Sequence, residues 1–287
     1  MKKIIVLVVV LALLAVLGLL VLSLSPVQDK ILDRGTAMIA KRGTQGLPAS
    51  ESLRVFVCGS ASPLGMGQAQ ACIAVVTPEH FYLIDSGAGS TNNIARLNLP
   101  TDRLDGILIS HFHSDHIAEI YEVNLNSWVT GRKEPMRVIG PQGVGEVVDG
   151  INVTYQHDRQ YRSAHHGEAF LPPHLGLIDH QTVTAGVIID DGDLKITAYR
   201  AEHPPIDPGL GYRIDYRGRS VVISGDSNVS AETERVVAGA DLLLHDALSV
   251  PTLSRLSKAF SAVGQSRMSK IVDDVMDYHA STESLIA

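Results

Sequence analysis

The stretch Leu104-Asp-Gly-Ile-Leu-Ile-Ser-His-Phe-His-Ser-Asp-His116 decides how this chain is organised. Its apolar run 107–109, bounded by a glycine and a serine, predicts a short buried strand. Four side chains that can bind metal follow directly: His111, His113, Asp115 and His116. In extended or turn backbone, His111 and His113 point to the same side and can hold one ion, while Asp115 and His116 lie past the bend, where they can hold a second. Imidazole and carboxylate together suit zinc, and they also accept manganese or iron.

This His-x-His-x-Asp-His arrangement after a strand resembles the metallo-β-lactamase superfamily. The resemblance implies an α/β (α+β) fold, the αββα four-layer sandwich, with two metal ions, expected to be zinc, held between its two halves. Two further segments resemble the ribonuclease Z and arylsulfatase-like branch of that superfamily. They are the Gly-Ser-Ala-Ser-Pro loop at 59–63, which follows a predicted strand at 54–58, and Ile-Asp-Ser-Gly-Ala-Gly at 84–89.

Later residues extend the same resemblance. His203 stands at the end of a predicted strand and, by this resemblance, completes the three histidines of the first ion. Asp226, in Ser-Gly-Asp-Ser, corresponds to the ligand that bridges both ions. For catalysis the resemblance implies roles for Asp115, for His245 behind the ligands, and for His279, which would help to protonate the leaving group. The stretch around His279 also fits the plain start of a helix.

Asp85 has two readings. It closes a predicted strand at 81–84, where it can cap the turn into the next helix, or its carboxylate can orient a ligand histidine. The two cysteines, Cys58 and Cys72, lie at the end of one predicted strand and the start of the next. We expect two buried thiols in apolar surroundings, with a disulfide as the alternative in an oxidising compartment.

The N-terminal residues predict a membrane anchor. An uncharged apolar run from Ile4 to Leu24 follows Met-Lys-Lys. As a helix it would measure about 31 Å, enough to cross the apolar part of a bilayer. We therefore expect a signal anchor or transmembrane helix at 1–25, a linker at 26–52, and a hydrolase domain at 53–287 outside the cytoplasm, periplasmic or extracellular.

The segment 155–173 is polar, aromatic and rich in histidine. It predicts either a solvated surface helix or a loop that faces the substrate. In the second case Tyr161, Arg162 and His165 are the candidates for contacting an anionic group.

Composition and spacing bear on the substrate. The net charge of −7 disfavours a general nucleic-acid binder. Ribonuclease Z enzymes that process tRNA carry a long basic arm between the counterparts of His203 and Asp226, whereas only 22 residues separate these two here. The superfamily's last metal ligand is a histidine after one more strand. The sequence ends at Ala287 before such a strand, so we expect a chain that lacks its last strand and helix.

We therefore expect a dinuclear zinc hydrolase that acts on a small ester-like substrate, a phosphodiester or an aryl sulfate. The alternatives are a ribonuclease Z-type endonuclease and an anchored, non-catalytic metal-binding protein. The expected partners are a small-molecule substrate and a membrane, without nucleic acid, and the sequence leaves a homodimer open.

Overall fold

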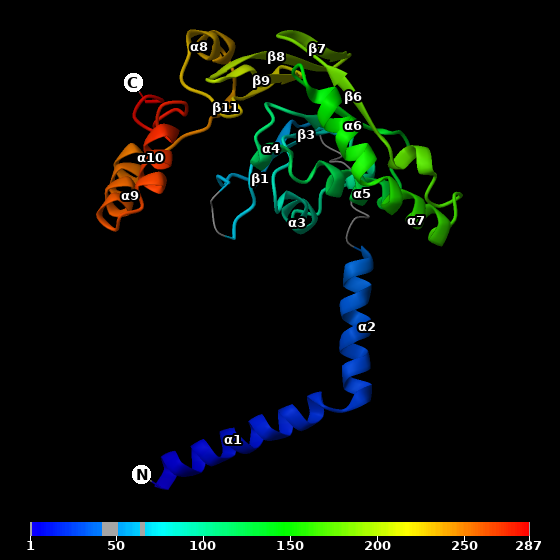
Figure 1. Ribbon diagram of the computed structural model, residues 1–287. Helices are drawn as coiled ribbons and strands as arrows, with labels where there is room; N and C mark the ends of the chain where they lie inside the picture. The colour runs from blue at the N-terminus through cyan, green and yellow to red at the C-terminus, as the bar shows by residue number, and fades with distance from the viewer. Residues whose placement is uncertain (1, 42–50, 64–66, 287) are drawn as a thin grey trace. The chain divides into compact units, whose positions relative to one another are not determined.

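The computed structural model describes residues 2–41, 51–63 and 67–286, which form two separate units, 1–46 and 47–287. The first unit contains helices α1 (Lys2–Leu22) and α2 (Ser25–Lys41), so residues 26–41 of the predicted linker are helical (Figure 1). Among the described residues no single helix passes as a membrane span, and the segments 10–22 and 25–38 pass only as a pair, with a bend of 72° between them. This finding does not support the predicted transmembrane helix, and it contradicts the membrane-anchored, extracytoplasmic location that we inferred from that helix.

The second unit begins with a six-stranded sheet in the order β1-β2-β3-β4-β5-β6. The pairs β1–β2 and β2–β3 are antiparallel, and every later pair is parallel, because helical crossovers link those strands. The strands are β1 (Arg54–Gly59), β2 (Cys72–Val76), β3 (Phe81–Ile84), β4 (Gly106–Leu108), β5 (Met136–Gly140) and β6 (Ile178–Thr182).

A second sheet of five strands has the order β11-β10-β9-β8-β7. It is antiparallel except for the pair β10–β11. Two of its tight turns use left-handed residues, Gly192 in one and Arg217 with Gly218 in the other, as is usual in two-residue hairpins. The strands are β7 (Gly186–Asp191), β8 (Leu194–His203), β9 (Ile206–Tyr216), β10 (Arg219–Ile223) and β11 (Leu242–Leu244).

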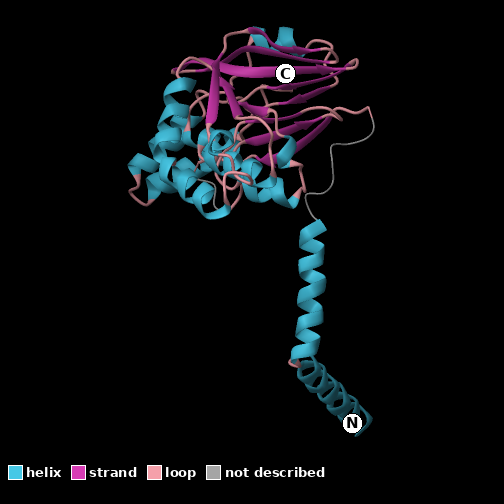
Figure 2. Ribbon diagram, turned by 90° about the vertical axis from the view of Figure 1, so that its right-hand side faces the viewer, coloured by secondary structure: helices cyan, strands magenta, loops and turns pink. Residues whose placement is uncertain are grey.

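The two sheets pack face to face through a shared apolar core (Figure 2). Alternation along β8 buries Leu194, Ile196 and Ala198 while Lys195 points to solvent. These residues meet a second set from the first sheet, which includes Tyr82, Ile84, Leu108 and Ile139. Because a strand shows its alternate residues to opposite faces, the period of two in the sequence is what builds this layer.

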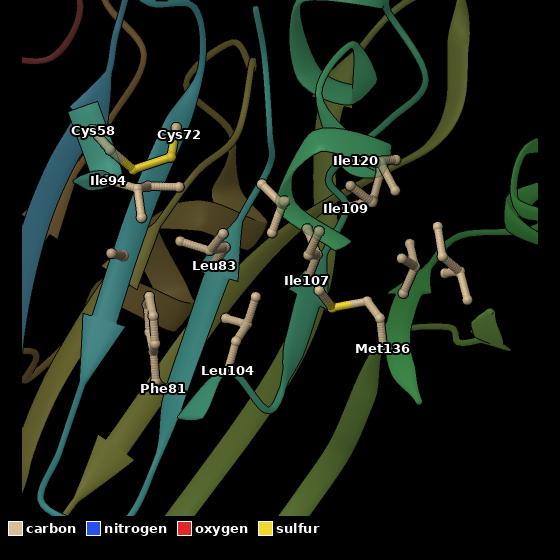
Figure 3. Close-up of a cluster of buried hydrophobic side chains, with 14 of the residues drawn as sticks. Cys58, Cys72, Phe81, Leu83, Ile94, Leu104, Ile107, Ile109, Ile120 and Met136 are labelled. Atoms are coloured by element: carbon tan, nitrogen blue, oxygen red, sulfur yellow. A yellow bond between two sulfur atoms is a disulfide. The ribbon is translucent and has the colours of Figure 1, made fainter. Parts of the chain in front are cut away.

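Helices cover the outer face of the first sheet through another apolar cluster, part of which is drawn in Figure 3. The remaining elements are α3 (Ser90–Arg96), α4 (Ser114–Ile117), α5 (Ile120–Thr130), α6 (Val144–Thr154), α7 (Gln156–His166), α8 (Ala231–Val237), α9 (Val250–Ala262), α10 (Ser266–Val275) and the 3₁₀ turns 101–103 and 173–176. The mixed α/β sandwich predicted from the sequence is confirmed. In the same cluster a disulfide joins Cys58 to Cys72, so the expectation of two separate thiols is wrong (Figure 3).

Candidate metal centre

The sequence motif 111–116 follows β4 directly. The backbone of Ile109 still bonds to β5, with its amide 2.8 Å from the carbonyl oxygen of Ile139. The chain then turns, and His113 becomes the residue before α4, whose first turn carries Asp115 and His116. His111, Asp115 and His116 are buried, whereas His113 is exposed. A buried strand therefore fixes the start of the motif, and a short helix fixes its end.

Residues from the second sheet complete the cluster. His203 is the last residue of β8, and Asp226 follows β10. The backbone before Asp226 comes close to Ser110. Gly225 permits this approach, since it adopts φ +63° and a Cβ on it would lie only 2.8 Å from Cβ of Ser110. A bond from the amide of Leu210 to the carbonyl oxygen of Ser110, 2.9 Å long, joins the two sheets at the same place.

The possible ligand atoms fall into three groups, in each of which all atoms lie within 4.8 Å of one another. The first contains His111, His113, His203 and Asp226, the second contains Asp115, His116 and Asp226, and the third contains Asp226, Asp246 and His279. Asp226 is common to all three groups. Its carboxylate therefore stands where a ligand shared by two ions would stand, as the sequence resemblance implies.

Asp85 lies behind the histidines. Its Oδ2 is 2.7 Å from Nδ1 of His116, and its carboxylate also accepts bonds from the amide and the hydroxyl of Ser110, at 2.8 and 2.7 Å. The Ser110 hydroxyl in turn lies 3.1 Å from Nδ1 of His111. Because Nδ1 of His116 is taken up in this way, Nε2 is left to face Asp226, whose Oδ2 is 3.2 Å away.

The third histidine of the first group is held similarly. Nδ1 of His203 lies 2.9 Å from the carbonyl oxygen of Tyr278 and donates a hydrogen bond to it. The next residue, His279, has its own Nδ1 at 2.5 Å from Oδ2 of Asp246. The C-terminal segment thus orients one candidate ligand and brings a second imidazole to the edge of the cluster.

The donor atoms fit divalent metal ions. Nε2 of His111, Nε2 of His203 and Oδ1 of Asp115 are buried and find no hydrogen-bond partner among the described residues. Leaving such atoms without a partner costs about 1–3 kcal/mol each, which a metal ion would offset. Three imidazoles and one carboxylate, next to a second group with two carboxylates, match the ligand chemistry of zinc and similar ions.

The protonation states agree with this fit. Burial lowers the pKa of His111 to about 2, and it also lowers the pKa of His203. Burial alone would raise the pKa of Asp226, but the hydrogen bond and charge of His116 hold it below its ordinary value. The neutral imidazoles of His111 and His203 and the ionised carboxylate of Asp226 are the forms that bind metal. Burial opposes the charged form of His116, but Asp85 and Asp226 raise its pKa well above the ordinary value, so a metal ion bound at Nε2 would displace a proton.

Besides Asp85, four predicted site residues lie outside the three groups. His245 is half-buried, with Nδ1 2.7 Å from the carbonyl oxygen of Asp246, and its Nε2 has no partner among the described side chains. Tyr161, Arg162 and His165 all lie on α7, the surface helix that was one of the two readings of this segment. Arg162 is paired there with Asp158 at 2.7 Å.

Two residues of the centre were absent from the predicted site. Asp246 belongs to the third group, and Ser110 links Asp85 to His111. Asp246 is the acid directly after His245, so the His-acid pair in the sequence carried a signal for it. Ser110 precedes the motif, and no feature of the sequence marks a serine there as more than a strand boundary.

Fold and centre together define a hydrolase of the β-lactamase superfamily. The chain belongs to this family, since the family model described as "Beta-lactamase superfamily domain" matches residues 80–280. Its similarity is more specific than that. The chain is 31% identical to ribonuclease Z of Mycobacterium bovis over 239 aligned residues, and the alignment covers 82% of this chain and 80% of the relative. It is 30% identical to ribonuclease Z of Mycobacterium avium, with the same coverage of both chains.

Solved structures agree on the fold. Human tRNase Z, short form, superimposes with a TM-score of 0.53 at 18% identity, over 80% of this chain and 93% of that one. The metallo-β-lactamase fold protein YhfI from Bacillus subtilis gives 0.53 at 19% identity, over 69% and 72%. The resemblance to the ribonuclease Z branch is confirmed, whereas the arylsulfatase part of that prediction finds no support.

Proposed function

We propose that this chain is a metal-dependent phosphodiesterase that cuts RNA, a ribonuclease Z-type endonuclease. The observation that carries the proposal is the similarity to ribonuclease Z relatives along 82% of the chain. Beside it, five candidate metal ligands gather around the carboxylate of the sixth, Asp226. The expected small-molecule ester and the exclusion of nucleic acid find no support in these relatives. RNA therefore replaces the small ester as the proposed substrate.

In this proposal His111, His113 and His203 would hold one divalent ion, zinc in first place, and Asp115 and His116 would hold a second, with Asp226 available to both. Bound ions of this kind would acidify a water molecule and neutralise charge on a phosphate group. Asp115 has an unpartnered buried Oδ1, and burial raises the pKa of its carboxyl. We assign it to orienting the attacking water.

His279 is the proposed proton donor to the leaving oxygen. Its burial opposes the charged form, but the hydrogen bond to Asp246 prevails and raises the pKa of the imidazole. Because Nδ1 is bound to Asp246, Nε2 is the nitrogen that remains for the substrate. As the P–O bond breaks, a proton from this nitrogen would pass to the departing oxygen. His245 would support the loop that carries Asp246.

The test is cleavage of a tRNA transcript with a 3′ extension, with bis(4-nitrophenyl) phosphate as a small diester. Full-length protein loaded with zinc or manganese is expected to cut both, and His113→Ala is expected to lose at least about 100-fold in kcat/KM on both while keeping its fold. His174→Ala, on the turn at 173–176 and outside the three groups, is the matched control. Undiminished cleavage by the His113 variant would refute the proposal.

A further inference from the structure

Helices α9 and α10 lie side by side as a hairpin (Figure 1). The base of the hairpin lies at the metal centre, because Asp246 and His279 flank it in the chain. The chain leaves the centre after Asp246 and returns at His279, and these two side chains are 2.5 Å apart. Backbone bonds close the base. The amide of Leu248 lies 2.9 Å from the carbonyl oxygen of Ala280, and the amide of Thr282 lies 3.0 Å from the carbonyl oxygen of Leu248. Whatever binds the hairpin is therefore brought close to His279.

The hairpin carries a positive charge that stands out from the rest of the chain. Residues 247–272 contain Arg255, Lys258, Arg267 and Lys270 and no aspartate or glutamate, in a protein with a net charge of −7. All four cationic side chains are exposed. Acidic residues resume only at Asp273, beside the base of the hairpin.

Most of this charge is uncompensated. Lys270 pairs with Asp274, with its Nζ at 2.7 Å from Oδ1. Arg255, Lys258 and Arg267 form no ion pair with any residue that the structure describes. Three cations without ion-pair partners on adjacent helices repel one another and slightly destabilise the hairpin. These side chains therefore do not serve the stability of the hairpin.

Helix geometry gathers the cations on one side. The Oγ atoms of Ser257 and Ser269 are 2.9 Å apart and mark where α9 touches α10. Lys258 and Lys270 each follow their serine by one residue, which turns them by about 100° from the contact. Because the two helices of the hairpin run antiparallel, the same rotation from the serine contact places both lysines on the same face of the helix pair. Arg255 and Arg267 both precede the contact by two residues and flank that face.

We propose that this face, Arg255, Lys258, Arg267 and Lys270, binds the phosphate backbone of an RNA substrate and holds it against the metal centre. The inference rests on the proposed function. A small anion would contact one or two converging cations, whereas four cations spread over two helices suit a polyanion. The hairpin thus supplies the positive surface that the short connection between His203 and Asp226 cannot supply.

The hairpin also exposes apolar side chains, which suggest a partner other than RNA. Leu256, Val263 and Ile271 are 42%, 70% and 40% exposed, which would also suit contact with a second copy of the chain. The charge favours RNA, because copies that present the same cationic face to each other would repel.

The test compares two triple variants that lose the same charge. One is Arg255→Gln/Lys258→Gln/Arg267→Gln, and the control is Arg96→Gln/Lys133→Gln/Lys195→Gln, three exposed cations outside the hairpin. Binding of a mature tRNA transcript is measured at several salt concentrations, because the mature transcript serves as an uncut probe. We expect the hairpin variant to raise Kd at least about tenfold and to flatten the slope of log Kd against log salt by about 2–3. The control should match wild type.

Hydrolysis of bis(4-nitrophenyl) phosphate separates this inference from the proposed function. It should stay within about twofold of wild type in both variants, because a small diester needs only the centre. If wild type fails to hydrolyse the diester, the proposed function falls while the binding result still tests the hairpin. A hairpin variant with the Kd and salt slope of its control overturns the inference. A hairpin variant that keeps its affinity for the tRNA transcript but changes the oligomeric state measured by light scattering also overturns the inference.

Discussion

Oδ2 of Asp85 lies 2.7 Å from Nδ1 of His116, although 31 positions separate the two residues. The same carboxylate accepts two bonds from Ser110, so one side chain fixes both the ring of His116 and the residue before His111. Asp85 itself has φ +60°, a left-handed conformation that costs an ordinary residue about 1 kcal/mol or more. That strain is offset by the bonds that the carboxylate makes.

We therefore expect Asp85→Asn to lower zinc affinity about 10–100-fold while the protein stays folded, because the ring of His116 loses its charged partner. Competition with a chromogenic chelator measures the affinity. Asp190→Asn, which changes an exposed acid on β7, is the control. Equal affinity in the two variants would show that Asp85 only closes the turn.

Gly225 permits the close approach of the two sheets. In Gly225→Ala the new Cβ would meet Ser110 at 2.8 Å and the carbonyl oxygen of Leu210 at 3.0 Å, so the backbone before Asp226 must shift. We expect loss of bound metal, counted by elemental analysis, and a lower Tm. Gly218→Ala separates the two causes, since Gly218 has φ +76° with no atom within 4 Å of its Cβ position. It should keep its metal and lose stability only through backbone strain, about 1 kcal/mol.

Glu119 caps α3 from a distant part of the chain. Its carboxylate accepts bonds from the amides of Gly89 and Thr91, at 2.6 and 2.8 Å, and from the Thr91 hydroxyl at 2.6 Å. Glu119→Gln should cost about 1–2 kcal/mol in the free energy of unfolding, measured with urea. Glu122→Gln, an exposed acid on α5, should cost far less.

The same cap predicts a pH dependence. Burial would raise the pKa of Glu119, but its hydrogen bonds to Thr91, Gly89 and Ser90 outweigh burial and lower it below the ordinary 4.5. A lowered folded pKa gives stability that is present above pH 4.5 and lost as the pH falls through the folded value. The difference in unfolding free energy between wild type and Glu119→Gln should therefore shrink in acid. A constant difference from pH 7 to pH 3 would contradict this assignment.

The disulfide closes a loop between residues 14 positions apart. Loop-closure entropy predicts that reduction costs about 3 kcal/mol. Reductant should lower the urea midpoint of wild type and leave that of Cys58→Ala/Cys72→Ala unchanged. Two free thiols titrated in the unreduced, unfolded protein would contradict the bond.

Site residues that are neighbours in the chain were the easiest to predict from the sequence. The ligands at 111–116 lie next to one another, so their chemistry could be read without knowing the fold. His203 and Asp226 are far apart in the chain and were assigned only through a family resemblance. The α/β sandwich was likewise predicted from the family resemblance, and the alternating apolar residues of strands such as β8 are what builds it.

The misses also have physical causes. β6, Ile-Asp-His-Gln-Thr, is an edge strand with one buried residue, so it has no alternating pattern, and α9 is rich in serine, which competes with helical hydrogen bonds. The chain breaks between α4 and α5 at residues 118 and 119, and the side chain of Glu119 at this break caps α3. The apolar N-terminal run forms α1, and the bend between Leu22 and Ser25 lies at the end of that run, where α2 begins.

The candidate ligands come from both sheets, with His111 and His116 after β4 of one sheet and His203 and Asp226 from the other. Ions bound by all of them would tie together the two halves of the sandwich, and their binding free energy would add to the stability of the folded state as RT ln(1 + [metal]/Kd). Resistance to proteolysis would then rise and fall with the supply of metal. A cell short of zinc would lose the protein itself, beyond losing its activity.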